Sequence, residues 1–412
     1  MMNYEPLSKV FYKDKERYLP LYNARYQSDA TYRFDFQIGK FPAFCMMTPE
    51  LSDLLVSIYK QNAQIETMLQ KLPGHVQLRF ISTCMIDEMQ LSNDIEGVRS
   101  SRQDFERLMD SVPTKKRKRF QGLFNKYMLL LEKDHLVLET CQDVRALYDE
   151  LCLSEVLEED ENNRPDGKCF RKSGVSVLSE TQKEIHKGSF PESEIILQMG
   201  QALFILNDES VSAMVRVAVF HYLFGYIHPF YDGNGRMSRF ISSSRMANEL
   251  NILTCFRLSH TIKKNLTAYY KSFEMGNNSR NRGDLTPFVL TFLKIVADSQ
   301  KDMISILKDN HKKLVFYDEL LREVAKTDEK GKEILTNLLA SSLFLKEGFS
   351  VAGLCEGSGL SDSTVRKYLK EFQQQNLLFV DRKGRQKVYG IDIDFLDQLV
   401  DESLENGEEI TI

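Results

Sequence analysis

The chain contains little glycine or proline, with 21 and 10 residues among 412. Few helix breakers in a sequence rich in good helix formers favour a mainly α-helical fold. No uninterrupted apolar run reaches the roughly 20 residues that span a bilayer, and the first residues lack the basic-then-apolar pattern of a signal sequence. We therefore expect a cytoplasmic protein that makes no membrane contact.

Cysteine is scarce and poorly placed for cross-linking. Seven cysteines are scattered along the chain, and none belongs to a Cys-x-x-Cys pair. This spacing argues against a disulfide framework and against a structural zinc site, and it is typical of reduced thiols. The net charge of −5 gives no global signal for nucleic acid, so such binding would need a local patch.

The end of the chain has the order of a winged helix-turn-helix. Residues 349–356 and 362–376 read as two helices joined by a turn, and residues 377–391 read as a hairpin. Residues 349–392 hold seven Lys and Arg against five Asp and Glu, a net charge of +2. That charge is too small to establish DNA contact, since winged helices also bind proteins or dimerise.

The most informative stretch is residues 228–239, which read His-Pro-Phe-Tyr-Asp-Gly-Asn-Gly-Arg-Met-Ser-Arg. The apolar helix that precedes it must stop before Pro229, and a new helical pattern starts at Arg236. Gly233-Asn234-Gly235 therefore forms a tight turn at a helix start, where glycines allow positive φ. The free N–H groups and the helix dipole at such a turn favour an anion.

The charged residues around this turn suit phosphoryl or nucleotidyl transfer. Arg236 and Arg239 are three residues apart and share a helix face near the anion. Asp232 offers a hard oxygen ligand for Mg²⁺. His228 is placed to act as a base.

These twelve positions match, without a departure, the signature His-Pro-Phe-x-Asp/Asn-Gly-Asn-Gly-Arg-x-x-Arg, and the chain thus resembles the Fic-domain family. The resemblance implies a Fic helical bundle with a β-hairpin flap, and transfer of AMP from ATP to a Tyr, Thr or Ser hydroxyl of a protein. Relatives that phosphorylate instead carry a lysine in the glycine turn, so Gly233 and Gly235 favour AMP transfer.

The resemblance also implies the role of each residue. His228 would take the hydroxyl proton, Asp232 would hold Mg²⁺, and Arg239 would pair with the γ-phosphate of ATP. The other residues expected to bind the nucleotide are flap residues Val175, Ser176, Val177 and Leu178, turn residues Gly233, Asn234, Gly235 and Arg236, and the nucleoside-contacting Tyr269, Tyr270 and Asn277.

Residues 92–97, Ser-Asn-Asp-Ile-Glu-Gly, resemble the inhibitory motif of the family, Ser/Thr-x-x-x-Glu-Gly/Asn. Ser92 and Glu96 are four apart on one helical face, and Gly97 ends the helix. The resemblance implies that Glu96 reaches Arg239 and holds it away from ATP. In some relatives this glutamate also activates water to remove AMP, and that activity stays open here.

The length predicts two or three domains. We predict an N-terminal helical region with the inhibitory helix (1–112), a Fic catalytic core (113–300), a helical linker (301–348), and a winged helix with an acidic tail (349–412). Residues 1–45 read as irregular. The last twenty residues contain seven acids and no bases, which argues against an ordered core there.

Two functions from different classes fit this sequence. The first is a protein adenylyltransferase that uses ATP and Mg²⁺ on a protein target or on itself. The second is a DNA-binding regulator whose Fic region only senses nucleotide. The intact His228 favours the enzyme, because a sensor has no need of a base. DNA binding through the winged helix and homodimer formation both stay open.

Overall fold

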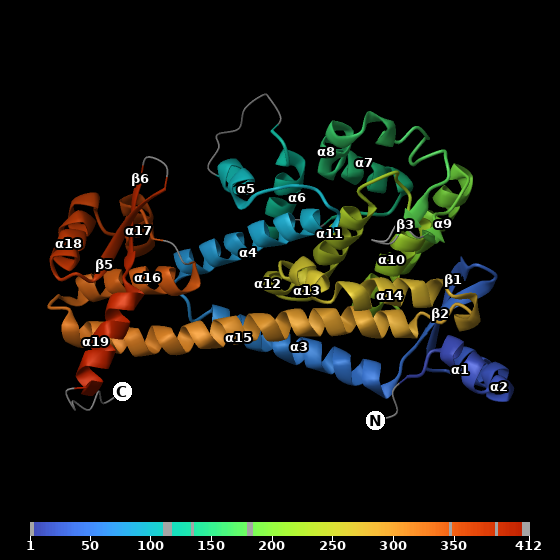
Figure 1. Cartoon of the computed structure of the whole chain (residues 1–412), viewed down its shortest axis with the longest axis horizontal. Helices are drawn as coiled ribbons and strands as arrows, with labels where there is room; N and C mark the ends of the chain where they lie inside the picture. Colours follow the sequence, from blue (N-terminus) through green and yellow to red (C-terminus); the bar gives the residue numbers. More distant parts are fainter. Residues whose placement is uncertain are drawn as a thin grey trace. The chain divides into compact units, whose positions relative to one another are not determined.

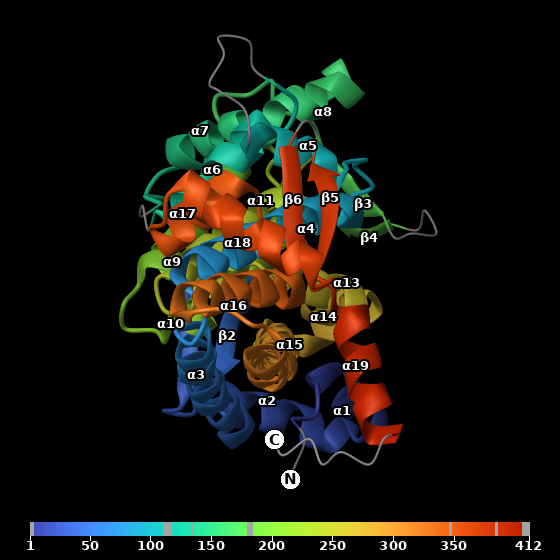
Figure 2. The ribbon, with the colours of Figure 1, turned by 90° about the vertical axis from the view of Figure 1, so that its left-hand side faces the viewer.

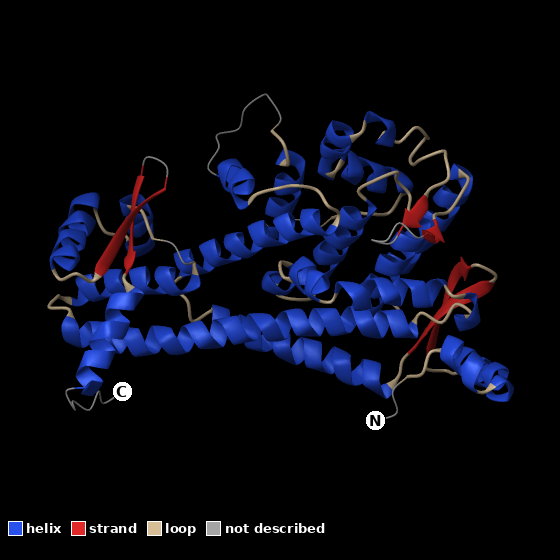
Figure 3. Cartoon of the chain, in the orientation of Figure 1, coloured by secondary structure: helices blue, strands red, loops and turns tan. Residues whose placement is uncertain are grey.

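A computed structural model of the chain describes residues 4–109, 118–132, 136–178, 184–345, 348–383 and 386–405. The described residues are mainly helical, with three two-stranded antiparallel sheets, as expected from the composition (Figure 1, Figure 3). They form two compact units: residues 1–62 with 85–301, and residues 63–84 with 302–412. The predicted boundaries at residues 112, 300 and 348 stay predictions. No helix in the described ranges has the length and apolar character needed to cross a membrane.

The N-terminal region is ordered, so the expectation that residues 1–45 are irregular is wrong. It forms α1 (Leu7–Lys13), α2 (Lys15–Gln27), β1 (Thr31–Ile38) and β2 (Phe41–Met46). Asp14 caps α2 by accepting a hydrogen bond from the Arg17 N–H. Tyr18, Tyr22 and Tyr26 recur at the helical spacing of four residues, but Pro20 lies inside α2, and an internal proline argues against a helix in the sequence.

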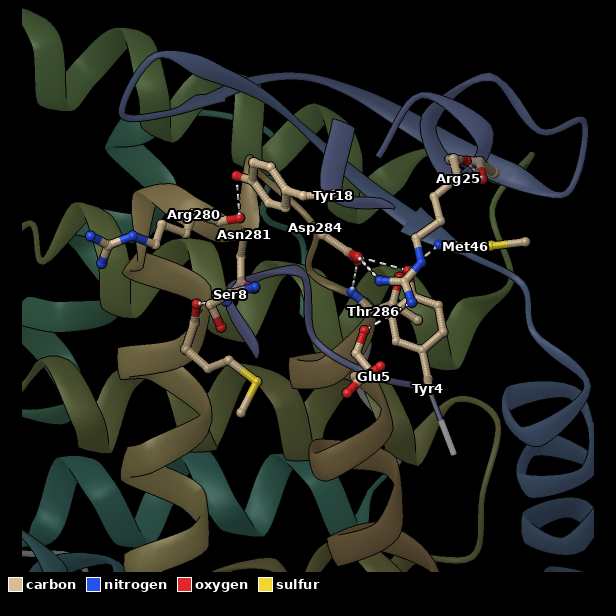
Figure 4. A network of polar contacts seen from close by, with 12 residues as sticks. Tyr4, Glu5, Ser8, Tyr18, Arg25, Met46, Arg280, Asn281, Asp284 and Thr286 are labelled. Atoms are coloured by element: carbon tan, nitrogen blue, oxygen red, sulfur yellow. Dashed lines mark hydrogen bonds and ion pairs between the residues drawn. The ribbon is translucent and has the colours of Figure 1, made fainter. Parts of the chain in front are cut away.

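This region docks onto the loop before α15 (Thr286–Val324) through the buried Asp284 (Figure 4). The Tyr4 hydroxyl donates to Asp284 Oδ2 at 2.7 Å, and Arg25 Nη1 lies 3.3 Å from the same oxygen. The Thr286 N–H donates to Oδ1 at 3.0 Å. Burial raises the pKa of the Asp284 carboxyl, while these partners oppose that rise.

After β2 come the long helices α3 (Pro49–Leu69) and α4 (Gly74–Ile95). Thr48 caps α3 by accepting from the Leu51 N–H. The segments that follow are α5 (Arg102–Met109), α6 (Gln121–Leu131), α7 (Cys141–Leu151), α8 (Leu153–Glu159), η1 (Glu161–Asn163), β3 (Ser176–Leu178), β4 (Glu184–Lys187), α9 (Glu192–Asn207), α10 (Ala213–Ile227), α11 (Asn234–Ala247), α12 (Ile252–Cys255), α13 (Leu258–Lys264), α14 (Leu266–Asn277) and η2 (Ser279–Asn281).

Helix α10 lies at the centre of the first unit, since 11 of its 15 residues are buried. A helix that is apolar on all sides must be surrounded by protein. Its last residue, Ile227, is therefore held inside the core, and the signature that follows it starts from a fixed point. The long α15, seen end-on in Figure 2, passes from the first unit into the second.

The second unit contains the predicted helix, turn, helix and hairpin. After α16 (Glu329–Phe344) come α17 (Val351–Ser358), α18 (Asp362–Gln374), β5 (Leu378–Lys383) and β6 (Gln386–Ile391). Ser361 caps α18 by accepting from the Thr364 N–H. Four residues of α18 at helical spacing are buried: Val365, Tyr368, Leu369 and Phe372. Gly384 and Arg385 of the predicted wing lie outside the described residues.

The acidic end of the chain is partly ordered, which corrects the expectation for residues 393–405. They form α19 (Ile393–Glu405), in which Leu396 is fully buried. The Tyr317 hydroxyl donates to Asp397. Apolar residues at helical spacing supply one packed face, and this outweighs the acidic composition. Residues 406–412 of the predicted tail lie outside the described residues.

Candidate active site

The signature forms a closed loop between α10 and α11. His228 ends α10 in the left-handed conformation (φ 51°), and Gly233 precedes α11 with φ 79°. Asn234 closes the loop, since its Oδ1 accepts from the Phe230 N–H at 3.0 Å and its Nδ2 donates to the Phe230 carbonyl at 2.8 Å. The Phe230 ring stacks on Tyr148 at 3.7 Å. The Asn234 side chain, expected to cradle phosphates, thus fixes the shape of the loop.

The buried Arg236 marks an anion site at the start of α11. Its side chain is 2% exposed, and its Nε and Nη2 atoms have no hydrogen-bond partner among the described residues. The carboxylate of Asp232 lies 3.6 Å from Nη2. Nη2 is thus ion-paired with Asp232 but makes no hydrogen bond, and a buried N–H without an acceptor costs free energy, so an acceptor from water or a bound anion would stabilise these atoms. A phosphate group has the charge and the oxygens to provide it.

Arg239, expected to pair with the γ-phosphate, is fully engaged by the end of α4. Its Nη1 lies 2.8 Å from Glu96 Oε1, within the predicted salt-bridge distance. Its Nε donates to the Ser92 hydroxyl at 3.0 Å, and Nη2 donates to the Ser92 carbonyl at 2.7 Å. The Arg239 side chain is only 1% exposed. Each of the three guanidinium nitrogens therefore bonds to one of two residues of the predicted inhibitory motif.

The Glu96 carboxylate also lies against the glycine turn. A Cβ atom at Gly235 would overlap Glu96 Oε1 and approach Arg239 Nη1 to 2.9 Å. Only glycine leaves room for the carboxylate at this position. Gly97, with φ 74°, turns the chain away directly after Glu96. An anionic side chain thus lies where the turn and the helix dipole favour an anion.

His228 is half-buried and is kept uncharged at neutral pH. Burial lowers the pKa of His228 to about 4, and the nearby Arg171 guanidinium adds to the decrease. His186 lowers the pKa further, and Glu96 opposes these effects. A neutral imidazole can accept a proton, which is the state that a general base requires.

The expected flap is present as the β3–β4 hairpin. Ser176 pairs with Lys187 and Val177 with His186 in antiparallel register. The Gly188 N–H donates to the Val175 carbonyl at 3.0 Å, which closes the base of the hairpin. The side chains of Val177 and Leu178 lie outside the described part of the chain. Nucleotide contacts of the flap therefore stay a prediction.

The residues expected to contact the nucleoside lie beside α10. Tyr269 is buried, and its hydroxyl lies 2.6 Å from Nε2 of the buried His221. Asn277 Oδ1 accepts from the Tyr222 hydroxyl at 2.7 Å. Tyr270 is half-buried. Burial raises the pKa of Tyr269 and the nearby Arg239 opposes this rise, so Tyr269 lies beside the Glu96–Arg239 pair, and its contact with a nucleoside stays a prediction.

Asp232 can hold a metal ion only if a bound molecule, such as a nucleotide, supplies further oxygen ligands. Its Oδ1 accepts from the Gly233 N–H at 2.6 Å, and the residue is half-buried. Within the described ranges, no three His, Cys, Asp or Glu side chains cluster as a metal site. Mg²⁺ is commonly held by one or two carboxylates plus substrate phosphates and water. The donor set fits Mg²⁺ that enters with a nucleotide.

Two contributions to the site were missed in the sequence. Arg171 is buried and donates to the His228 carbonyl at 2.9 Å. The Tyr231 hydroxyl, at a variable position of the signature, donates to Asp166 Oδ1 at 2.9 Å and accepts from the Ser173 N–H at 3.1 Å. Neither residue has a sequence pattern that indicates these contacts, because each partner is 57 or more residues away.

Known proteins similar to this chain agree with the signature. Residues 139–244 match the model of the Fic/DOC family. The protein adenylyltransferase fic-1 of Caenorhabditis briggsae is 30% identical over 141 residues, 33% of this chain but only 26% of that protein. A Fic family protein from Desulfovibrio desulfuricans G20 has a similar fold, with a TM-score of 0.51, 20% identity, and coverage of 84% of this chain and 97% of that chain. Fic-1 from C. elegans covers 63% of this chain and 74% of its own, at 18% identity and a TM-score of 0.42.

Proposed function

We propose that this chain, which belongs to the Fic/DOC family through residues 139–244, is a protein adenylyltransferase that Glu96 holds inactive. One observation carries the proposal: the Glu96 carboxylate lies between the glycine turn and Arg239. In the same turn, Nε and Nη2 of Arg236 make no hydrogen bond among the described residues. The turn is built for an anion, and a side chain of the same protein occupies part of it. The name of the C. briggsae relative supports AMP transfer as the reaction.

In the proposed reaction, His228 accepts the proton of a Tyr, Thr or Ser hydroxyl. The freed oxygen attacks the α-phosphorus of ATP, the bond between the α- and β-phosphates breaks, and pyrophosphate leaves. Arg236 Nε and Nη2 donate to phosphate oxygens, which satisfies their missing bonds. Bound Mg²⁺ would neutralise phosphate charge, with Asp232 as its protein ligand. The target is a protein segment or the chain itself.

Inhibition follows from competition for one guanidinium. While Arg239 bonds to Ser92 and Glu96, all three of its nitrogens are held in place and its charge is paired with Glu96, so it is not positioned for the γ-phosphate. ATP then binds with its phosphates displaced, and a displacement of about 1 Å can cost on the order of 10²-fold in rate. The same carboxylate would be available to activate water if the enzyme also removes AMP.

The test is mass spectrometry of the purified chain incubated with MgATP. We expect no adduct on the wild type and the added mass of one AMP on Glu96→Gly. A modified target incubated with the wild type would reveal removal of AMP as loss of that mass. The proposal fails if Glu96→Gly, correctly folded and binding ATP, modifies neither itself nor any protein of a cell lysate.

A further inference from the structure

The buried Arg171 bonds to four backbone carbonyls. Its Nε donates to His228 at 2.9 Å, Nη1 to Ser173 at 2.6 Å, and Nη2 to Ser189 at 2.9 Å and Ile227 at 3.4 Å. The residue is 0% exposed. None of the ion pairs found in the described ranges includes Arg171. A fork of five N–H donors suits this arrangement, which a single ammonium group cannot reproduce.

These four bonds join the catalytic loop to both sides of the hairpin base. Ser173 precedes β3, Ser189 follows β4, and Ile227 ends α10. Two backbone bonds reinforce the junction: the Ser189 N–H donates to the Ile227 carbonyl at 3.0 Å, and the Arg171 N–H donates to the Pro229 carbonyl at 3.2 Å.

The packing at this junction is close. A Cβ atom at Gly188 would lie 2.5 Å from Arg171 Nη2 and 3.0 Å from His228 Cβ. The hairpin therefore starts directly beside the base. His228 itself has a left-handed backbone, which residues other than glycine adopt only at an energetic cost. The bond from Arg171 to its carbonyl helps to hold this conformation.

We propose that Arg171 is the positioning residue that fixes the His228 imidazole relative to the hairpin, so that a target segment lying along β3 or β4 presents its hydroxyl to the base. This inference rests on the proposed function, in which His228 is the base. Arg171 touches neither the hydroxyl nor the phosphates in this scheme, and it positions His228 through the backbone that carries it.

Arg171 has a second effect, through its charge. Its guanidinium contributes to the low pKa of His228, together with burial and His186, while Glu96 acts in the opposite direction. The charge and the four bonds can be separated by substitution. Arg171→Lys keeps the charge but not the fork, whereas Arg171→Met removes both with a similar side-chain volume.

The experiment compares these variants with their parent, the released Glu96→Gly chain, using AMP transfer to a target. We expect kcat to fall about 10²-fold in both variants, with the affinity for ATP unchanged. The acid limb of the pH profile should stay in place for Arg171→Lys and move to higher pH for Arg171→Met.

Arg145→Met is the matched control, because Arg145 is half-buried, bonds to the Cys169 carbonyl and pairs with Asp149 without touching the loop. Its kcat should equal that of the parent.

A titration that needs no activity completes the test. The His228 resonance, assigned by its loss in His228→Ala, is followed by NMR in histidine-labelled protein. We expect a higher His228 pKa in Arg171→Met than in the parent or in Arg171→Lys.

An unchanged kcat in both variants, the same loss of kcat in Arg145→Met, or an unmoved His228 pKa in Arg171→Met would overturn the inference. A silent parent would defeat the proposed function instead, and the titration would still decide the role of Arg171. Should Arg171→Met fail to fold, the kcat of Arg171→Lys decides.

Discussion

The Nη1 atom of Arg239 lies 2.8 Å from Oε1 of Glu96, although the two residues are 143 positions apart in the chain. Ser92 engages the other two nitrogens of the same guanidinium. The contact ties the end of α4 to the first turns of α11, where the proposed phosphate site lies. Any ligand that needs Arg239 must therefore displace α4 contacts first.

Replacing Glu96 with Gly should release the enzyme. The substitution frees one guanidinium nitrogen and clears the space beside Gly235, so we expect AMP transfer to rise by about 10²-fold or more. Radiolabel transfer from α-labelled ATP measures this rise. Asp94→Ala is the control, since Asp94 lies on the same helix but pairs with Lys263 at 3.0 Å. Equal labelling by wild type and Glu96→Gly would remove the inhibitory role of Glu96.

Replacing His228 with Ala in the released chain should silence it again. General-base catalysis is typically worth about 10²–10⁴ in rate, and the release of Arg239 cannot replace a base. Calorimetry should show nearly unchanged ATP binding, because the phosphate-binding groups lie on α11. Labelling by the double variant at the rate of Glu96→Gly would show that another group removes the proton.

Replacing Asp232 with Ala should weaken the response to Mg²⁺. The only protein oxygen proposed for the metal is then lost, so activity should fall and ordinary Mg²⁺ concentrations should not restore it. ATP affinity, measured with and without Mg²⁺, gives a readout independent of turnover. Titrations of the variant and the wild type that overlay would contradict the assignment.

Whether residues 349–392 bind DNA can be tested by electrophoretic mobility shift. On α18, Arg366 pairs with Asp362 at 2.5 Å and Lys367 with Glu371 at 3.7 Å, which leaves these cations partly neutralised. We expect at most weak binding, detected as a mobility shift at low salt that disappears as salt rises. A shift that persists at 200 mM salt would favour the DNA-binding regulator instead. No shift at low salt would indicate a protein-binding or dimerising domain.

The buried Glu88 should make stability depend on pH. It accepts three hydrogen bonds from Ser259, but burial dominates and raises the pKa of Glu88 to about 7 from its ordinary 4.5. The folded chain therefore holds this proton while the unfolded chain releases it. The free energy of unfolding should fall as pH rises from about 4.5 to about 7, by about 3 kcal/mol from this group.

Glu88→Gln tests this prediction, because glutamine does not titrate and its single amide oxygen can still accept from the Ser259 N–H and hydroxyl. Urea unfolding at pH 5 and pH 7.5 should show a smaller difference for the variant than for the wild type. An identical pH dependence in both proteins would assign the effect to other groups.

The residues that sequence reasoning placed correctly are those joined by short-range patterns. The turn at Gly233 and the helix, turn, helix and hairpin of residues 349–391 all depend on spacings of a few residues. The approach of Glu96 to Arg239 was predicted across a long separation, because two matched motifs each fixed one partner.

The residues that were missed depend on contacts between distant segments. The role of Arg171 was missed because its burial depends on carbonyls contributed by α10 and by the loop after β4. The nucleoside contact expected of Tyr269 stays a prediction, and its hydroxyl lies beside His221 on α10. Helix α2 was missed because Pro20 lies inside it, although Tyr18, Tyr22 and Tyr26 recur at the helical spacing of four residues.

The Nε and Nη2 atoms of Arg236 link binding at the site to the melting temperature of the chain. An anion that accepts hydrogen bonds from these atoms binds at a position that only the folded chain forms, so it binds the native state in preference to the unfolded one. Such a ligand at 100 times its Kd raises the free energy of unfolding by about 2.7 kcal/mol. A thermal-shift assay can therefore detect nucleotide bound at this site, even in variants that do not transfer AMP.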